Sequence, residues 1–197
     1  MYKTKGRPKA FDEGEVLAAA MNYFWTHGYS NASLKNLLIT MGIKKSSFYH
    51  TFGSKEELFS RTLELYRKET LVYLNGLKKD IGPKATMLML TEITIKELQE
   101  TGNVKGCLLV NSGQECYNKY KNLSHQIKME FNFMQEVFVS FIKEAQDLGE
   151  IKSTKEPKVI AGRYMNSLNG LIVTIQVGAS DDVLIDDIVE SLKEILE

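Results

Sequence analysis

The sequence lacks the features that would indicate a membrane protein or a secreted one. No apolar run approaches the roughly 18 residues that a membrane span needs, and the nearest candidate, residues 168–177, is interrupted by polar residues and glycine. Basic residues near the N-terminus are followed at once by Asp12, Glu13 and Glu15, which argues against a secretory signal. We therefore expect a cytoplasmic protein that does not associate with membranes.

Chemistry-bearing residues are also scarce, with two cysteines and three histidines in 197 residues. In an intracellular chain two cysteines are expected to be thiols, and no close ligand pairing accompanies them that would predict a metal site. The sequence has no Gly-rich phosphate loop, no Gly-x-Ser-x-Gly elbow and no His-Glu-x-x-His pattern. An enzyme is therefore the least favoured class, and no cofactor is predicted.

Charge is balanced overall but distributed unevenly. The chain has 25 basic and 25 acidic residues. Residues 1–55 hold eight Lys or Arg and three acidic residues, a net charge of +5, so residues 56–197 carry −5. One basic end on an acidic body is typical of a protein that meets nucleic acid with that end only. Residues 1–10 are expected to form either a solvated tail or a basic arm that becomes ordered on phosphates.

Residues 33–58 contain two short helical patterns that meet at a glycine. Apolar residues recur at helical spacing before Gly42 and again after it. Gly42 can take the positive φ of a tight turn because it has no Cβ. This is a helix-turn-helix pattern, and its second helix would present polar side chains to a DNA major groove: Lys44, Lys45, Ser46, Ser47, Tyr49 and His50. On spacing alone, plain packing within a helical bundle explains the pattern equally well.

Further landmarks occur in a fixed order through residues 16–58. They are an apolar helix ending in Phe24, His27-Gly28-Tyr29, Ser33, Met41-Gly42-Ile43, Phe48-Tyr49-His50 with Phe52, and Ser54-Lys55-Glu56-Glu57-Leu58. Together they resemble the DNA-binding domain of the tetracycline-repressor (TetR) family. The resemblance implies phosphate contacts from Ser33, Tyr49 and Lys55, with Lys45, Ser46, Ser47 and His50 in or near the groove.

The recognition helix departs from the family pattern at its start. Lys44 stands where the family usually has Ser or Thr, and a lysine cannot accept hydrogen bonds from the unpaired N–H groups of a first helical turn. Small family residues are replaced by Leu38, Met41 and Ser46, and Thr51 replaces a His or an aromatic residue. We expect the start of this helix to be frayed or shifted in register.

The rest of the chain is a series of amphipathic helical patterns. Ser54 and Glu57 form a capping box that starts a helix continuing to about Leu77. Other helices are predicted over residues 12–27, 87–98, 123–148, 158–177 and 181–196. The predicted fold is all-α. A three-helix, helix-turn-helix DNA-binding domain with its basic arm occupies residues 1–55, and a helical effector-binding and dimerisation domain occupies residues 56–197.

Residues 106–118 resemble, more weakly, a helix of one TetR subgroup, through Gly106-Cys107-Leu108, Asn111 and Glu115. Cys107 is expected in a first helical turn beside Lys105, where free N–H groups and a cation both favour a thiolate. It is a candidate sensor of oxidants or electrophiles, although a small buried core residue is the alternative. Cys116 should point about 180° away from Cys107 on a helix, which excludes a disulfide between them while the helix persists.

A second candidate site lies in the predicted helix over residues 123–148. Met129, Phe133 and Met134 could line a pocket for an apolar small-molecule effector, and ordinary core packing is the alternative. With Cys107, Asn111 and Glu115, these are the candidate effector residues.

The last two predicted helices carry more apolar surface than one thin helical layer can bury. Gly162, Ser167 and Gly170 would allow close approach of another helix. The family resemblance implies a four-helix bundle between two copies, that is, a homodimer that presents two recognition helices about 34–36 Å apart to a palindromic double-stranded operator. The predicted function is a transcriptional repressor that an effector releases from DNA. An effector-independent DNA-binding module is the alternative.

Overall fold

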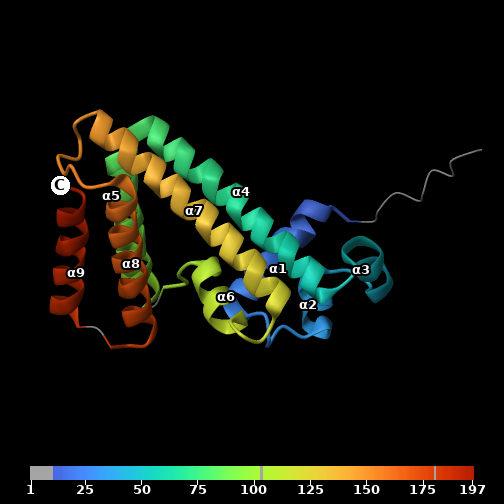
Figure 1. Cartoon of the computed structure of the whole chain (residues 1–197). Helices are drawn as coiled ribbons and strands as arrows, with labels where there is room; N and C mark the ends of the chain where they lie inside the picture. The colour runs from blue at the N-terminus through green and yellow to red at the C-terminus, as the bar shows by residue number, and fades with distance from the viewer. Residues whose placement is uncertain (1–10, 103, 180) are drawn as a thin grey trace, which may run out of the picture.

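The computed structural model describes residues 11–102, 104–179 and 181–197, which form helices and no strands (Figure 1). The helices are α1 (Glu13–His27), α2 (Leu34–Met41), α3 (Lys45–Phe52), α4 (Lys55–Ile81), α5 (Pro83–Thr101), α6 (Leu108–Cys116), α7 (Lys121–Asp147), α8 (Pro157–Gln176) and α9 (Asp182–Ile195). The all-α prediction is therefore confirmed. The basic arm predicted over residues 1–10 lies outside the described residues.

Helices α1, α2 and α3 form a small bundle, called the head below, which packs against the start of α4. Phe24 of α1 and Phe48 of α3 are buried in its core. The Phe24 ring meets that of Phe59 on α4 edge-on, with centroids 4.9 Å apart, so α4 completes the core of the head. The turn between α2 and α3 is made by Gly42 at φ +65°, which confirms the predicted helix-turn-helix.

Among the described helices, α1, α2, α4 and α9 begin with a side-chain cap. Helix α3 has none. Asp12, Ser33, Ser54 and Asp181 each accept a hydrogen bond from the N–H three residues ahead, over 2.9, 3.2, 3.0 and 2.9 Å. Such a bond satisfies one of the free donors of a first helical turn. Lys44 occupies the equivalent position before α3 in an extended conformation and makes no cap bond, so α3 begins at Lys45 without a side-chain cap.

Two helices are longer than their sequence patterns predicted. Ser54 does cap α4, although its own N–H donates to the carbonyl of Phe52 and not to the Glu57 carboxylate. The helix continues past Leu77 to Ile81 and ends only at Gly82, where φ is +85°. Helix α5 begins at Pro83 rather than Met87. Proline suits a first helical position because its missing N–H would be unpaired there in any case.

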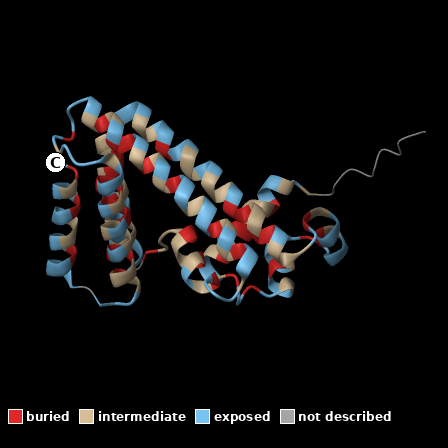
Figure 2. Cartoon of the chain, viewed as in Figure 1, coloured by how far each residue is buried: buried red, intermediate tan, exposed pale blue. Residues whose placement is uncertain are grey.

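The long helices α4 and α7 lie side by side and run from the head to the far end of the molecule, where α5, α8 and α9 pack (Figure 1). Buried residues follow the seams between these helices, while the outer faces of α8 and α9 are largely exposed (Figure 2). Tyr164 of α8 lies in the core, where its hydroxyl and that of Thr91 are 3.1 Å apart.

Within the described ranges, no helix is both long enough and apolar enough to cross a membrane.

Candidate DNA-binding surface and effector cavity

Helix α3 is divided into a buried face and a polar outer face. Phe48 and Phe52 are 0% and 3% exposed and anchor the helix to the rest of the head. On the other side the side chains of Lys44, Lys45, Ser46, Tyr49 and His50 are exposed, and Ser47 is half-buried. The helix sequence contains no acidic residue. The structure therefore brings the predicted groove residues together on one exposed surface that carries no negative side chain of α3.

The other predicted phosphate contacts lie at helix starts of the same head. Ser33 is exposed and caps α2 through its bond with the N–H of Asn36. Lys55, the first residue of α4, is half-buried, and its Nζ lies 4.4 Å from the centroid of the Tyr29 ring. Burial lowers the pKa of Lys55, and the nearby carboxylate of Glu115 opposes that shift. The ammonium group thus lies against the Tyr29 ring in the loop after α1, while the side chain stays partly exposed.

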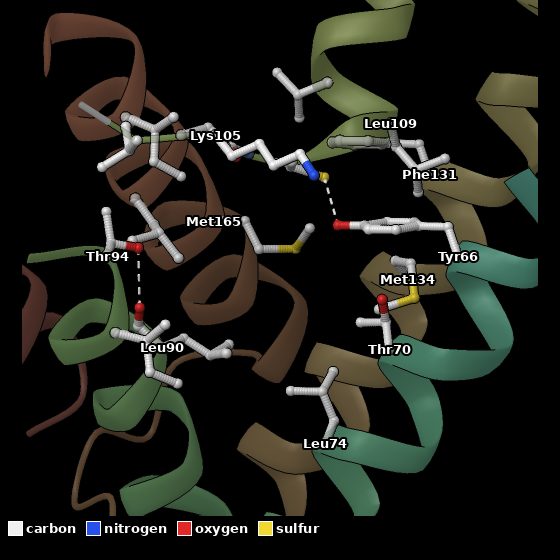
Figure 3. Close-up of a pocket in the computed structure, with 18 of the residues that line it drawn as sticks. Tyr66, Thr70, Leu74, Leu90, Thr94, Lys105, Leu109, Phe131, Met134 and Met165 are labelled. Atoms are coloured by element: carbon white, nitrogen blue, oxygen red, sulfur yellow. Dashed lines mark hydrogen bonds between the residues drawn. The ribbon is translucent and has the colours of Figure 1, made fainter. Parts of the chain in front are cut away.

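A partly open cavity of about 340 Å³ lies in the body and is lined by residues of six helices and of the segment before α6 (Figure 3). Its walls are mainly aliphatic, aromatic and sulfur-containing, and include Trp25, Leu74, Leu90, Ile93, Leu109, Phe131, Met134, Phe138, Met165, Leu168 and Ile172. Polar groups come from Tyr66, Thr70, Thr94, Glu97, Lys105 and Asn169. A mostly apolar hollow with a few converging polar groups suits a small organic ligand.

Cys107 lies in the wall of this cavity, at the N-cap of α6 rather than inside its first turn. The Tyr66 hydroxyl donates to Cys107 Sγ over 3.6 Å (Figure 3). Burial, followed by the Cys107 charge, raises the pKa of Tyr66 well above its usual value, so this hydroxyl remains a donor at neutral pH. The Lys105 ammonium group lies over the Trp25 ring at 4.2 Å from its centroid and donates to Asn22 Oδ1 over 3.1 Å.

Cys116 is placed differently from Cys107. It is fully buried, and burial raises its pKa to about 11. Both cysteines are free, although Cys107 precedes α6 and does not share the helix with Cys116 as predicted.

Of the three candidate pocket residues on α7, the structure places one in the cavity wall and two outside it. Met134 lines the cavity, with Phe131 and Phe138 at helical spacing on the same face. Met129 and Phe133 are 57% and 42% exposed and lie outside the cavity. Phe133 instead packs under the guanidinium of Arg67. The prediction failed because the three side chains do not share one face of the helix.

Asn111 and Glu115 lie on α6 but outside the main cavity. The Asn111 amide donates to the carbonyl of Lys105 over 3.0 Å and braces the segment that leads into α6. The Glu115 carboxylate accepts hydrogen bonds from the N–H groups of Tyr29 and Ser30, over 2.7 and 2.5 Å. Glu115 therefore joins the body to the head instead of lining the effector cavity.

Most residues of the cavity wall were not predicted from the sequence. Trp25 belongs to α1, Tyr66 to α4 and Met165 to α8, and no spacing within one helix relates them. No local signal in the sequence marks these residues as parts of one cavity wall.

Comparison with known families decides the classification. The N-terminal model of the bacterial regulatory proteins of the tetR family matches residues 16–62. The model named tetracyclin repressor-like, C-terminal domain, matches residues 84–185, more than half of the chain. The chain belongs to the TetR family. As a TetR protein, it is a helix-turn-helix transcriptional regulator.

Individual TetR relatives match over nearly their full length. The HTH-type transcriptional regulator YezE of Bacillus subtilis is 27% identical over 189 residues, which are 95% of this chain and 97% of YezE. The HTH-type transcriptional repressor ComR of Escherichia coli is 24% identical over 184 residues, 90% of this chain and 86% of ComR. These relatives are regulators, not enzymes.

Among solved structures, a cysteine mutant of the TetR family regulator CifR in complex with a 26-base-pair operator duplex superposes with a TM-score of 0.73. It is 24% identical, and the match covers 96% of this chain and 98% of CifR. At this identity the likeness shows that the two chains share the TetR fold.

Proposed function

We propose that the protein is a homodimeric repressor that holds a palindromic operator through α2 and α3 and releases it when an effector enters the cavity of the body. In this proposal residues 1–55 bind DNA, and residues 56–197 bind the effector and dimerise. The observation that carries the proposal is the outer face of α3, which is polar, exposed and free of acidic residues, while its inner face is locked into the head by Phe48 and Phe52.

The predicted DNA-binding residues of the head and of the start of α4 have two kinds of role in this proposal. Lys44 and Lys45 supply positive charge, and the hydroxyls of Ser46 and Ser47 and the imidazole of His50 can reach base edges from a helix lying in the major groove. Ser33, Tyr49 and Lys55 contact phosphates. The crystallised complex of CifR with its operator duplex supports this docking for the fold.

The outer faces of α8 and α9 support dimerisation. Val159, Val183 and Leu184 are 44%, 79% and 40% exposed although they are apolar. At Gly162 and Gly170 an added Cβ would meet no described atom within 4 Å, so another helix can approach closely there. A twofold dimer through this surface would present two copies of α3 to the two halves of a palindrome.

The cavity supports control by an effector. Its wall includes residues of the head (Trp25) and of the helix that leaves it (Tyr66), so an occupant touches the parts that orient α3. Release from DNA requires two arrangements of the protein, one that binds DNA and one that does not. The occupant must bind the second more tightly than the first. Two chemical classes fit the wall: a thiol-reactive compound that attacks Cys107, and an apolar molecule held without covalent bonding.

The test begins with selection of a duplex from random DNA by the full-length protein, followed by fluorescence anisotropy on that duplex. N-ethylmaleimide serves as the thiol-reactive probe. If Cys107 is the sensor, Cys107→Ser keeps its affinity for the duplex and loses release by the probe, while Cys116→Ser behaves as wild type. Release that persists in Cys107→Ser contradicts the thiol mechanism. Failure to select any duplex contradicts the proposed function as a whole.

The second candidate is a DNA-binding module without an effector. The cavity wall is mainly apolar, and a hollow with such a wall also results from loose packing of the core without any ligand. A ligand that copurifies in the cavity, or a compound from a small-molecule screen that shifts duplex affinity, argues against this candidate.

A further inference from the structure

Helix α6 is tied to the loop between α1 and α2 by one carboxylate. Both oxygens of Glu115 are used, with Oε2 accepting from the N–H of Tyr29 at 2.7 Å and Oε1 from the N–H of Ser30 at 2.5 Å. Hydrogen bonds to an ionised acceptor are shorter and stronger than neutral ones. The two consecutive N–H groups therefore bind both oxygens of one carboxylate, and we call this contact the joint. It connects positions that are 86 and 85 residues apart in the sequence.

The loop is shaped to receive this carboxylate. Gly28 has φ +77°, and a Cβ added there would lie 2.9 Å from Glu115 Oε2. Glycine therefore provides both the backbone conformation and the space. A second contact flanks the joint, where the hydroxyl oxygens of Ser30 and Tyr120 are 3.3 Å apart.

From this loop the chain runs directly into α2. The N–H of Ala32 donates to the carbonyl of Tyr29 over 3.3 Å, and Ser33 caps α2 at the next position. Tyr29 itself is buried and packs on Phe59 of α4, with ring centroids 4.9 Å apart. The position of the Tyr29 and Ser30 amides therefore sets where α2 begins relative to α4.

The other end of α6 forms part of the cavity wall through Cys107, Leu109 and Val110. A helix of nine residues is about 13 Å long and behaves as a rigid rod over that length. Displacement of Leu109 or Val110 by an occupant therefore displaces Glu115 at the opposite end.

We propose that Glu115 is the positioning residue through which α6 holds the head, so that occupancy of the cavity reaches α2 and α3 by moving or breaking this joint. The inference rests on the proposed function, because it assigns the path by which effector binding changes DNA affinity. The joint needs a carboxylate of this length. Glutamine offers one acceptor oxygen in place of two, and aspartate is one methylene too short.

The first experiment measures the joint without DNA, by amide hydrogen exchange in the full-length protein. In Glu115→Gln, exchange at Tyr29 and Ser30 should rise by about tenfold or more, since each N–H loses a charge-assisted acceptor. The matched control is Glu64→Gln, which removes the same charge from an exposed side chain of α4 whose electrostatic neighbour is Glu130 of α7 and not the loop between α1 and α2. Equal exchange in Glu115→Gln and wild type overturns the proposal.

The second experiment tests transmission by filling the cavity from α6. Val110 is half-buried in the wall, and Val110→Trp stands in for an occupant, with Val110→Phe as the smaller variant should the first fail to fold. In the wild-type background the filled cavity should raise exchange at Tyr29 and Ser30 and weaken binding to the selected duplex by about tenfold. In the Glu115→Gln background the same substitution should change affinity by less than about twofold.

The outcomes separate the two proposals. Unchanged exchange at Tyr29 and Ser30 in the filled variant overturns the role of Glu115. An equal loss of DNA affinity in both backgrounds also overturns it, because the signal then travels by another path while the regulator itself works as proposed. If the wild type selects no duplex, the proposed function fails, and the exchange measurements still decide whether the joint responds to the cavity.

Discussion

The uncapped start of α3 leads to a prediction with opposite effects on stability and on DNA binding. Lys44 already has the extended backbone of an N-cap residue, with φ −77° and ψ 151°. Ser33 and Ser54 have similarly extended backbones and cap their helices with bonds of 3.2 and 3.0 Å. Serine in place of Lys44 can therefore accept from the N–H of Ser47 without rearrangement of the chain.

The expected magnitudes follow from the two roles of this position. A serine cap is worth about 1 kcal/mol over a residue that cannot cap, which corresponds to a rise in Tm of about 2–4 °C for a chain of this size. The logarithm of the DNA-binding constant falls as the logarithm of the salt concentration rises, and loss of one phosphate-facing charge should make this slope less steep by about 0.9 for each head. Lys44→Ser should thus be more stable than wild type and bind DNA more weakly at low salt.

Urea unfolding followed by circular dichroism gives the first quantity, and anisotropy on the selected duplex at several salt concentrations gives the second. Ser54→Ala is the matched control, because it removes a cap without changing charge. It should lose about 1 kcal/mol and keep the salt slope of the wild type. A Lys44→Ser protein with unchanged stability refutes the capping argument, and an unchanged salt slope refutes the phosphate contact.

Three further predictions concern DNA contact, thiol reactivity and assembly. Tyr49→Ala should weaken binding to all duplexes by a similar factor and Tyr73→Ala should not, although both side chains are 49% exposed; an effect of Tyr49→Ala on selected sequences only would mean a base contact. Iodoacetamide at pH 8 should label Cys107 before Cys116, since a thiol with a pKa of about 11 is only about one part in a thousand thiolate there; peptide mass spectrometry showing early label on Cys116 would contradict its burial. Val183→Glu should leave monomer stability nearly unchanged, because the side chain is 79% exposed, and should raise the fraction of monomer in sedimentation velocity; an intact dimer would place the interface elsewhere.

Local features of the head could be predicted from the sequence because they depend on residues close together in the chain. The start of α1 at Asp12, the turn at Gly42, the cap at Ser54 and the missing cap at Lys44 are all as predicted. Each depends on a backbone conformation or a hydrogen bond spanning three residues. The amphipathic spacing of α3 also identified which of its side chains would be exposed.

The cavity and the joint could not be predicted in this way. Trp25 and Met165 line one hollow from α1 and α8, and no local pattern relates two positions so far apart in the chain. Glu115 was grouped with the effector residues because of its place on α6, but its partners are the amides of Tyr29 and Ser30. Helical periodicity shows on which face of its helix a residue lies, but not which element packs against that face. For the same reason Met129 and Phe133 were wrongly expected in the cavity wall.

Trp25 is the single tryptophan of the chain, and its position makes it a built-in optical reporter. Its indole N–H donates to the carbonyl of Gly106 over 3.1 Å, its ring meets that of Tyr66 edge-on at 5.1 Å, and it forms part of the cavity wall. Indole emission depends on the polarity and the quenchers around the ring. Compounds entering the cavity can therefore be screened by intrinsic fluorescence, in unlabelled protein and before any operator sequence is known.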